Sequence, residues 1–440
     1  MGTVILLLFG ILILLVCLQV PIAIALAASS LLVVLIEGSV PLTLFIQTSF
    51  SSMDSFPLIA IPFFILAGDI MSRGGMAKRL VEFIQSMVGS LTGSLGIITI
   101  IASFIFAAIS GSGAATVASI GAILIPYMLK SGYAPGYAAS IAASAGGLGP
   151  IVPPSIVFIL YGVMSGTSIS DLFIAGIMPG ILVAVSLLIV NYLICKREGY
   201  GTVNHRVFAE TAATFEEKQK VSFWKALNEA KWALLAPVLI LGGIYGGIVT
   251  PTEAAVVAVV YSLIICTFFY REINLKNFLE IFLQSARTSG SILIFVSAAS
   301  FFGQVLSIER IPQFLADTIS GWTTNPLIIL LLINIFLLIV GMFMETIAAV
   351  LIFVPLLLPI VLALGIDPIH FGMIVCLNLS LGLITPPLGI NLFIGSNIAN
   401  ISFEKALRYV VPIFGALLVV LFIITYIPSI TLFLPKLIGG

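Results

Sequence analysis

The sequence predicts an all-α membrane protein that crosses the bilayer about ten times. Of the 440 residues, 60% are hydrophobic and 8% are charged, and the mean hydropathy is +1.27. The apolar stretches are continuous and roughly 20 residues long, as membrane helices require, whereas the strands of a barrel would alternate apolar and polar residues. Glycine and proline landmarks of the first half recur in the second half. These observations predict two repeats of membrane helices.

The first repeat begins with an apolar stretch at residues 3–37 that is interrupted by Gln19-Val20-Pro21. As one helix it would be about 50 Å long, well beyond the ~30 Å hydrocarbon core. A single steeply tilted helix is one interpretation. The match of this stretch to residues 232–270, described below, favours two helices.

The pattern of residues 94–130 predicts a re-entrant hairpin. Two apolar arms flank Ser110-Gly111-Ser112-Gly113, and each arm is only about 24 Å long at helical rise. Residues 134–166 then predict a helix broken at Gly149–Ser155, where two prolines each lack an N–H. An isolated break of this kind is usually a kink or a packing site. Two breaks in one span favour a binding site, because unpaired backbone is tolerated in hydrocarbon only inside protein or around a cavity.

The segment 196–231 differs from the rest of the chain because it is rich in Lys, Arg and Glu. We interpret it as a cytoplasmic connector, in part an amphipathic helix. It divides the chain into a first repeat at residues 1–195 and a second repeat at residues 232–440.

The second repeat has the landmarks of the first, shifted by 233 positions. The shift predicts a second hairpin at 326–365 and a second broken helix at 368–399. Further spanning helices are expected at about 288–306, before the hairpin, and at about 406–434, after the broken helix. The positive-inside rule then places the two repeats in opposite orientations across the membrane. Near the N-terminus the shift is 230 and pairs Pro21 with Pro251. The pairs at 233 are Pro126/Pro359, Gly132/Gly365, Pro135/Pro368, Gly149/Gly382, Pro153/Pro386, Pro154/Pro387, Gly162/Gly395 and Pro179/Pro412.

Glu345 occupies the position of Ser112 in the second hairpin and is the only acidic residue deep within an apolar span. An intramembrane carboxylate indicates a functional site, although it can also serve as a polar partner for a neighbouring helix. Each helix break offers carbonyls that suit a bare cation and N–H groups that suit a carboxylate. Neutral oxygens for a hard cation could come from the hydroxyls of Ser110, Ser112, Ser155, Thr346 and Thr385.

Other polar residues of the spans have two interpretations. Asn378, Asn391 and Asn397 could bond neighbouring helices or contact a solute, and His370 fits an interfacial position better than a catalytic one. A different class of function is an intramembrane serine hydrolase, in which Ser110 or Ser112 would pair with His370. An ion channel is a third class, which saturable turnover would exclude.

Several classes are disfavoured by composition. The formal net charge is zero and no basic run occurs, which argues against nucleic-acid binding. The four cysteines are scattered singly and fit neither a metal site nor a disulfide framework. No Gly-Lys dipeptide occurs, so the chain has no Walker A loop for ATP.

Four motifs resemble those of one family. They are Ser110-Gly-Ser-Gly-Ala-Ala-Thr116, Gly146-Gly-Leu-Gly-Pro-Ile-Val-Pro-Pro-Ser155, Pro251-Thr-Glu-Ala-Ala255 and Leu383-Ile-Thr-Pro-Pro-Leu-Gly389. Together they resemble the large membrane subunit of tripartite ATP-independent periplasmic (TRAP) transporters, over essentially the whole chain.

The resemblance implies a sodium-coupled secondary importer of organic acids such as C4-dicarboxylates or sialic acid, not an enzyme, in the bacterial inner membrane. It implies an elevator motion, in which a transport domain that carries both hairpins slides against a scaffold. It also implies two partners, a small four-helix membrane subunit and a soluble periplasmic substrate-binding protein. Sodium, as two or more coupling ions, is the implied cofactor.

The resemblance also implies site residues. The first sodium site would involve Ser110, Ser112, Gly149, Val152 and Ser155. The second would involve Met344, Glu345, Thr346, Gly382 and Thr385. The residues implied to contact the solute are Ser112, Thr116, Pro154, Glu345, Pro387 and Asn391.

Overall fold

The computed structural model contains helices and no strand in the residues it describes, which are 2–38, 41–89, 91–200, 222–323 and 325–438. Among these residues, nine helices are long and apolar enough to cross a membrane. The elements of the first half are α1 (Gly2–Cys17), α2 (Ile22–Glu37), α3 (Thr43–Met53), η1 (Phe56–Ile59), α4 (Ala60–Arg73), α5 (Met76–Val88), α6 (Ser94–Ser110), α7 (Gly113–Thr116), η2 (Val117–Gly121), α8 (Ala122–Lys130), α9 (Pro135–Gly146), α10 (Ile156–Ser165) and α11 (Ile169–Glu198). Those of the second half are α13 (Phe223–Tyr245), α14 (Pro251–Ile264), η3 (Ile265–Phe269), α15 (Leu275–Ile308), α16 (Ile311–Trp322), α17 (Pro326–Phe343), α18 (Thr346–Ala363), α19 (Pro368–Gly382), α20 (Ile390–Ile398), α21 (Phe403–Tyr426) and α22 (Ser429–Ile438).

Local chemistry explains where several helices begin and end. The apolar stretch at 3–37 forms two helices, as the repeat predicts, because the chain turns at Gln19 (φ 62°) and Pro21 fixes the entry to α2. Thr250 and Glu253 form a capping box at the start of α14. Asp367 caps α19 by accepting hydrogen bonds from Ile369 and His370.

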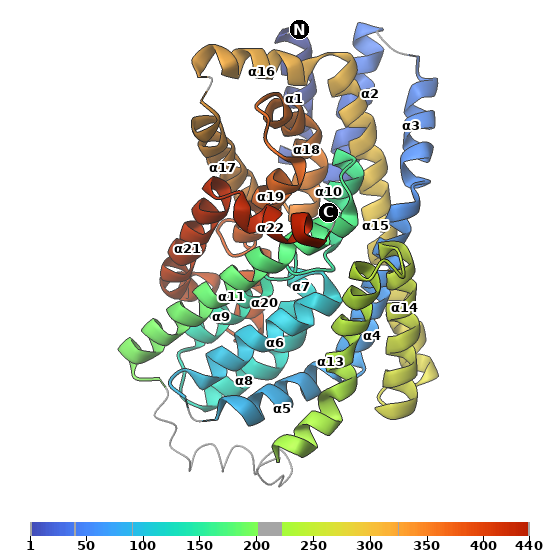
Figure 1. Ribbon diagram of the computed structural model, residues 1–440. Helices are drawn as coiled ribbons and strands as arrows, with labels where there is room; N and C mark the ends of the chain where they lie inside the picture. The colour runs from blue at the N-terminus through green and yellow to red at the C-terminus, as the bar shows by residue number, and fades with distance from the viewer. Residues whose placement is uncertain (1, 39–40, 90, 201–221, 324, 439–440) are drawn as a thin grey trace.

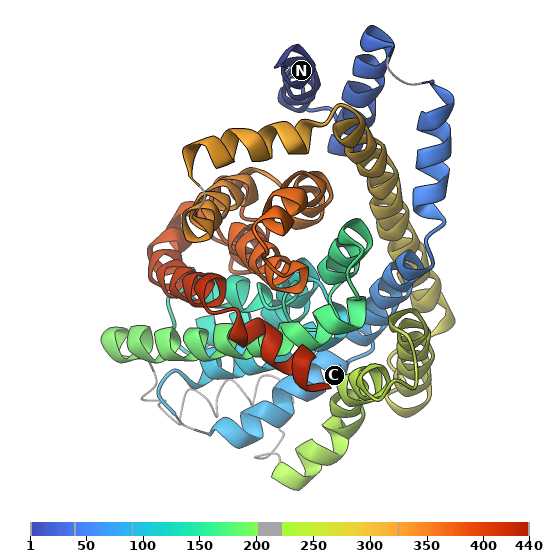
Figure 2. The same ribbon diagram turned by 45° about the horizontal axis from the view of Figure 1, so that its top comes forward.

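The helices form two groups (Figure 2). The belt consists of α1–α4 and α13–α15, which contact one another and form an arc. The bundle consists of α6–α11 and α17–α22, and it lies within that arc. Both hairpins and both broken helices belong to the bundle, so the predicted site lies there.

Two amphipathic helices, α5 and α16, lead from the belt into the bundle. Sequence reasoning did not predict either as a helix, although apolar residues recur along α5 at helical spacing. They lie at opposite ends of the molecule (Figure 1). The hairpin of α6–α8 lies at the end with α5, and the hairpin of α17 and α18 lies at the end with α16. This arrangement agrees with two repeats in opposite orientations.

The predicted shift of 233 positions describes the bundle closely. The second arm of the first hairpin, 113–130, corresponds to α18 at 346–363, and both ends agree under the shift of 233. The first arm, α6, corresponds to α17, and α9 and α10 correspond to α19 and α20 within a few residues at each end. The peptide bonds Pro153–Pro154 and Pro386–Pro387, which correspond under the same shift, are both cis.

Two helices differ from prediction in their boundaries. The single helix expected over 406–434 is two helices, because α21 ends at Tyr426 and Pro428 precedes α22. The helix expected over 288–306 is α15, which starts thirteen residues earlier at Leu275 and so also includes polar residues such as Gln284, Ser285 and Arg287. Most of the predicted connector helix, at 201–221, lies outside the described residues.

Candidate functional site

The tip of the first hairpin is a short extended turn between two helices. Gly111 ends α6 in the left-handed region (φ 60°), which favours glycine. Ser112 is extended and caps α7, because its hydroxyl accepts a hydrogen bond from the Ala115 amide at 3.5 Å. Sequence reasoning placed the interruption correctly.

The first helix break packs directly on this tip. The Ile156 amide donates to the Gly111 carbonyl at 3.4 Å. A Cβ on Gly149 would lie 2.4 Å from the Ser112 carbonyl carbon, so only glycine allows this approach. The structure thus brings together the two interruptions that were predicted to form one site.

Three oxygens gather at the first tip. The Ser110 hydroxyl lies 3.0 Å from the Thr116 hydroxyl, which donates to the Ser112 carbonyl at 2.8 Å. The Ser110 hydroxyl also lies 3.4 Å from that carbonyl. Ser110 and Thr116 are buried. Thr116, predicted as a solute contact, therefore lies among the predicted cation ligands.

The remaining residues of the first break have structural contacts. The Ser155 hydroxyl caps α10 by accepting from the Phe158 amide, and it donates to the Pro150 carbonyl at 2.7 Å. Val152 and Pro154 are buried beside it. Within this described stretch, no hydrogen bond reaches the carbonyls of Gly149 or Val152, so both can serve a ligand.

The second tip is built in the same way. Met344 and Glu345 are extended, and Glu345 occupies the cap position of α18, as Ser112 does for α7. The Glu345 side chain forms no cap, lies at the surface of the chain, and has no ion pair among the described residues. The Thr346 hydroxyl is buried without a hydrogen-bond partner.

The second break also packs on its tip. A Cβ on Gly382 would lie 2.3 Å from the Gly341 carbonyl oxygen. The Leu388 amide donates to the Met342 carbonyl at 3.1 Å. The Thr385 hydroxyl donates to the Leu381 carbonyl at 2.6 Å, and Pro387 is exposed.

Asn391 belongs to the second broken helix but contacts the first site. Its amide nitrogen donates to the Ala143 carbonyl at 3.2 Å. A Cβ on Gly113 would lie 3.0 Å from that nitrogen, which places it beside the first tip. Its side-chain oxygen is buried and has no partner. The side-chain nitrogen therefore bonds a neighbouring helix, as one of the two sequence interpretations expects, and solute contact through the side-chain oxygen stays a prediction.

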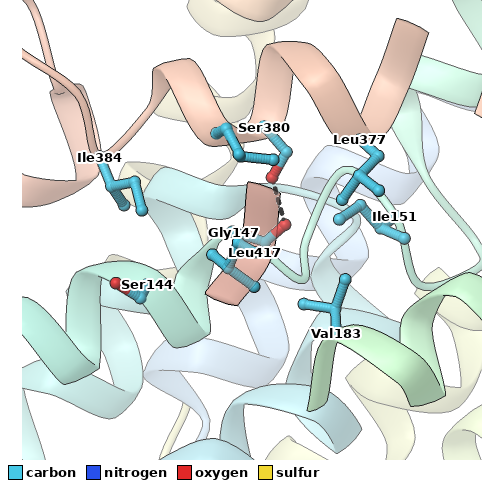
Figure 3. A pocket seen from close by; sticks show the side chains of 9 residues that line it. Ser144, Gly147, Ile151, Val183, Leu377, Ser380, Ile384 and Leu417 are labelled. Atoms are coloured by element: carbon cyan, nitrogen blue, oxygen red, sulfur yellow. Dashed lines mark hydrogen bonds between the residues drawn. The ribbon is translucent and has the colours of Figure 1, made fainter. Parts of the chain in front are cut away.

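The two broken helices meet at their equivalent positions. Ser380 donates from its hydroxyl to the carbonyl of Gly147, the residue 233 positions earlier, at 2.5 Å (Figure 3). A cavity of about 10 Å³ lies there, which is room for about one water molecule. Its lining includes the equivalent pairs Ser144/Leu377, Gly147/Ser380 and Ile151/Ile384. The contact marks the pseudo-twofold axis between the repeats.

The site chemistry suits a hard cation better than a transition metal. No group of three or more His, Cys, Asp or Glu residues that could hold a metal ion occurs in the described part of the chain. The available donors are hydroxyl, carbonyl and carboxylate oxygens, the ligands of hard cations. His370 bonds Thr431 and the Thr425 carbonyl, so it forms no serine–histidine pair with Ser110 or Ser112.

Comparison with known proteins agrees with this architecture. Residues 9–430 match the family model for the tripartite ATP-independent periplasmic transporter, DctM component. The isethionate TRAP transporter permease protein DctMQ of Oleidesulfovibrio alaskensis is 44% identical over 97% of this chain, which spans 65% of that relative's length. The sialic acid TRAP transporter large permease protein SiaM of Vibrio cholerae is 38% identical over 96% of each chain. The C4-dicarboxylate TRAP transporter large permease protein DctM of Pseudomonas aeruginosa is 40% identical over 89% of this chain and 88% of the relative.

Among solved structures, the YdaH transporter of Alcanivorax borkumensis has a similar fold, with a TM-score of 0.61. It is 14% identical, and the match covers 90% of this chain and 89% of that chain. These relatives are named transporters and permeases, and the described part of the chain holds nine candidate spans, so the protein is a multi-pass protein of the inner membrane. The chain belongs to the DctM family, the large membrane component of tripartite ATP-independent periplasmic transporters.

Proposed function

We propose that the chain imports an organic acid in symport with sodium. The observation that carries this proposal is the pair of equivalent constellations, each a hairpin tip packed on a helix break. At the first tip, oxygens of Ser110, Ser112 and Thr116 lie within 3.4 Å of one another, a donor set that fits a hard cation. The N-terminal ends of α10 and α20 offer N–H groups and positive dipole ends to an anion.

We further propose that the bundle moves as a unit against the belt. Small residues of α4 pack against the first hairpin, at its tip and along its second arm. A Cβ on Gly68 would lie 3.2 Å from the Ser110 Cα, and the Ser72 hydroxyl lies 2.5 Å from that of Ser119. The amphipathic helices α5 and α16 connect belt and bundle at both ends and can follow the motion.

The solute class is inferred from the relatives. Their names specify isethionate, sialic acid and C4-dicarboxylates, all of which are small organic anions. The family is tripartite by name. We therefore propose a small four-helix membrane subunit and a soluble periplasmic binding protein as partners, with the second of these delivering the solute.

Uptake into proteoliposomes tests the coupling. Vesicles with the chain and its small subunit should accumulate an organic acid only when a sodium gradient and loaded binding protein are both supplied. Replacing external sodium with potassium at equal ionic strength is the control. Accumulation that is equal in potassium would refute sodium coupling.

A further inference from the structure

A second cavity, separate from the two tips, lies between the belt and the bundle. Its volume is about 570 Å³, within the range of small-molecule sites. The belt wall comes from α3 and α15, and the bundle wall comes from α10 and α18. The lining residues are Thr48, Ser51, Ser52, Ser55, Val163, Met164, Ser300, Gly303, Gln304, Ser307, Ile308 and Pro355.

The two walls differ in chemistry. Nearly every lining side chain from the belt carries a hydroxyl or an amide, whereas the bundle contributes the apolar Val163, Met164 and Pro355. Polar side chains within a membrane need hydrogen-bond partners from protein or water, because lipid offers them none. A water-filled passage would supply those partners to the polar belt wall. The bundle wall is apolar, so the bundle can move past the belt at this cavity without breaking hydrogen bonds.

The cavity opens on the side opposite the basic end of α4. Arg73, Lys78 and Arg79 mark the cytoplasmic end of α4 by the positive-inside rule. The cavity residues of α3 precede α4 and so lie at its other end, together with the last turns of α10 and α15. Figure 1 shows α3, α10, α18 and the end of α15 in the half of the molecule away from α5.

Free donors face this space. The hydroxyls of Ser51, Ser52 and Ser307 already donate to carbonyls of their own helices. In contrast, no described partner accepts from the Ser55 or Ser300 hydroxyl or from the Gln304 amide nitrogen, whose side-chain oxygen accepts from Thr48 at 3.3 Å. Such neutral donors bind anion oxygens, and the lack of a lining cation favours fast release.

We propose that this cavity is the periplasmic vestibule, in which a small organic anion is held by hydroxyl and amide donors before it reaches the two tips. The inference rests on the proposed function, because it assigns an entry point to the same solute. It adds a binding site on the belt, which is distinct from both hairpin tips and both helix breaks.

Cysteine labelling tests access to the vestibule. The background is Cys17→Ser, since the other three cysteines are buried. Ser52→Cys should react with a charged, membrane-impermeant methanethiosulfonate added from the periplasmic side. Phe50→Cys is the matched control, because Phe50 lies on the same helix, is exposed, and does not line the cavity, so solute should not slow any labelling of this variant. Isethionate, sialic acid or succinate at twice the dissociation constant should slow the labelling of Ser52→Cys about threefold.

Uptake kinetics test recognition. Gln304→Met keeps the side-chain length and removes the donor, so KM for the solute should rise about tenfold with maximal uptake unchanged. Gln304→Asn should restore most of the affinity. An unchanged KM in Gln304→Met, or labelling of Ser52→Cys that no solute slows, overturns the vestibule.

Failure of the two proposals can be told apart. Wild-type vesicles that show no sodium-driven uptake refute the proposed function. Wild-type uptake without labelling of Ser52→Cys refutes the vestibule alone.

Discussion

The two tip-and-break constellations correspond in sequence position but differ in exposure. Every residue from 141 to 160, which includes the first break, is buried, and α4 covers the first tip at Gly68. At the second constellation, residues 385–388 are partly or fully exposed, and so is Glu345. One repeat therefore presents its site closed and the other presents it open. Exposure follows from what the rest of the chain packs against each tip, and the local sequence does not determine it.

Because the first constellation is buried, we expect substitutions there to reduce stability and uptake more than substitutions at the exposed second constellation. In Gly149→Ala the new Cβ would meet the backbone of Ser112 and Gly113 at 2.4–2.5 Å, and backbone cannot rotate away. We expect a loss of about 3 kcal/mol in stability and loss of uptake. Gly415→Ala, which meets nothing within 4 Å, should fold and transport normally.

Thermal melting in detergent and uptake in vesicles measure both effects. If Gly149→Ala melts and transports like the Gly415→Ala control, the tight contact between tip and break does not exist in the protein.

Removing one hydroxyl from each site should affect the two constellations differently. Thr116→Val removes the partner of Ser110 and Ser112, so we expect a cost of about 1–3 kcal/mol and a sodium requirement about tenfold higher. Thr346→Val removes a buried hydroxyl that has no partner, so the stability of the sodium-free protein should stay equal or rise by about 1 kcal/mol.

Melting in potassium and the sodium dependence of uptake separate the two roles. If Thr346 binds sodium, Thr346→Val should raise the sodium requirement without destabilising the protein in potassium. An unaltered sodium requirement in this variant removes Thr346 from the second site.

The smallest expected effect is at the pseudo-twofold axis. Ser380→Ala deletes the hydrogen bond to Gly147 that joins the two breaks. We expect a loss of about 1 kcal/mol in stability and a modest slowing of uptake. Ser396→Ala is a control, because the Ser396 hydroxyl is buried without a partner. Equal melting temperatures in the two variants would show that the axis contact contributes nothing.

Much of the architecture was predictable because glycine and proline act locally. The breaks at Gly149–Ser155 and Gly382–Pro387 recur at one shift, and that recurrence located both broken helices and the hairpins that precede them. Proline alone would not have sufficed, because Pro179 and Pro412 correspond under the same shift and lie inside helices. The split of the last helix at Pro428 was open to the same reasoning and was missed. The amphipathic helices α5 and α16 were missed because a search for apolar runs passes over segments with one polar face.

The site was predictable only in part. Spacing indicated that each tip meets a break, and the contacts of Gly149 and Gly382 confirm it. Spacing could not show that Asn391 of the second repeat reaches the first tip, since that contact depends on how α20 packs on α9. Nor could it show that Glu345 is exposed, because exposure depends on which distant helices cover a tip.

The central claim is that both constellations act on sodium. The most direct measurement is the sodium concentration for half-maximal uptake in Ser112→Ala and Glu345→Gln, compared with wild type in the same vesicles. These two residues hold the equivalent cap positions of α7 and α18. We expect a higher sodium requirement in both variants, with the larger rise in Glu345→Gln because a charged oxygen is lost. Wild-type sodium dependence in both variants would contradict the assignment.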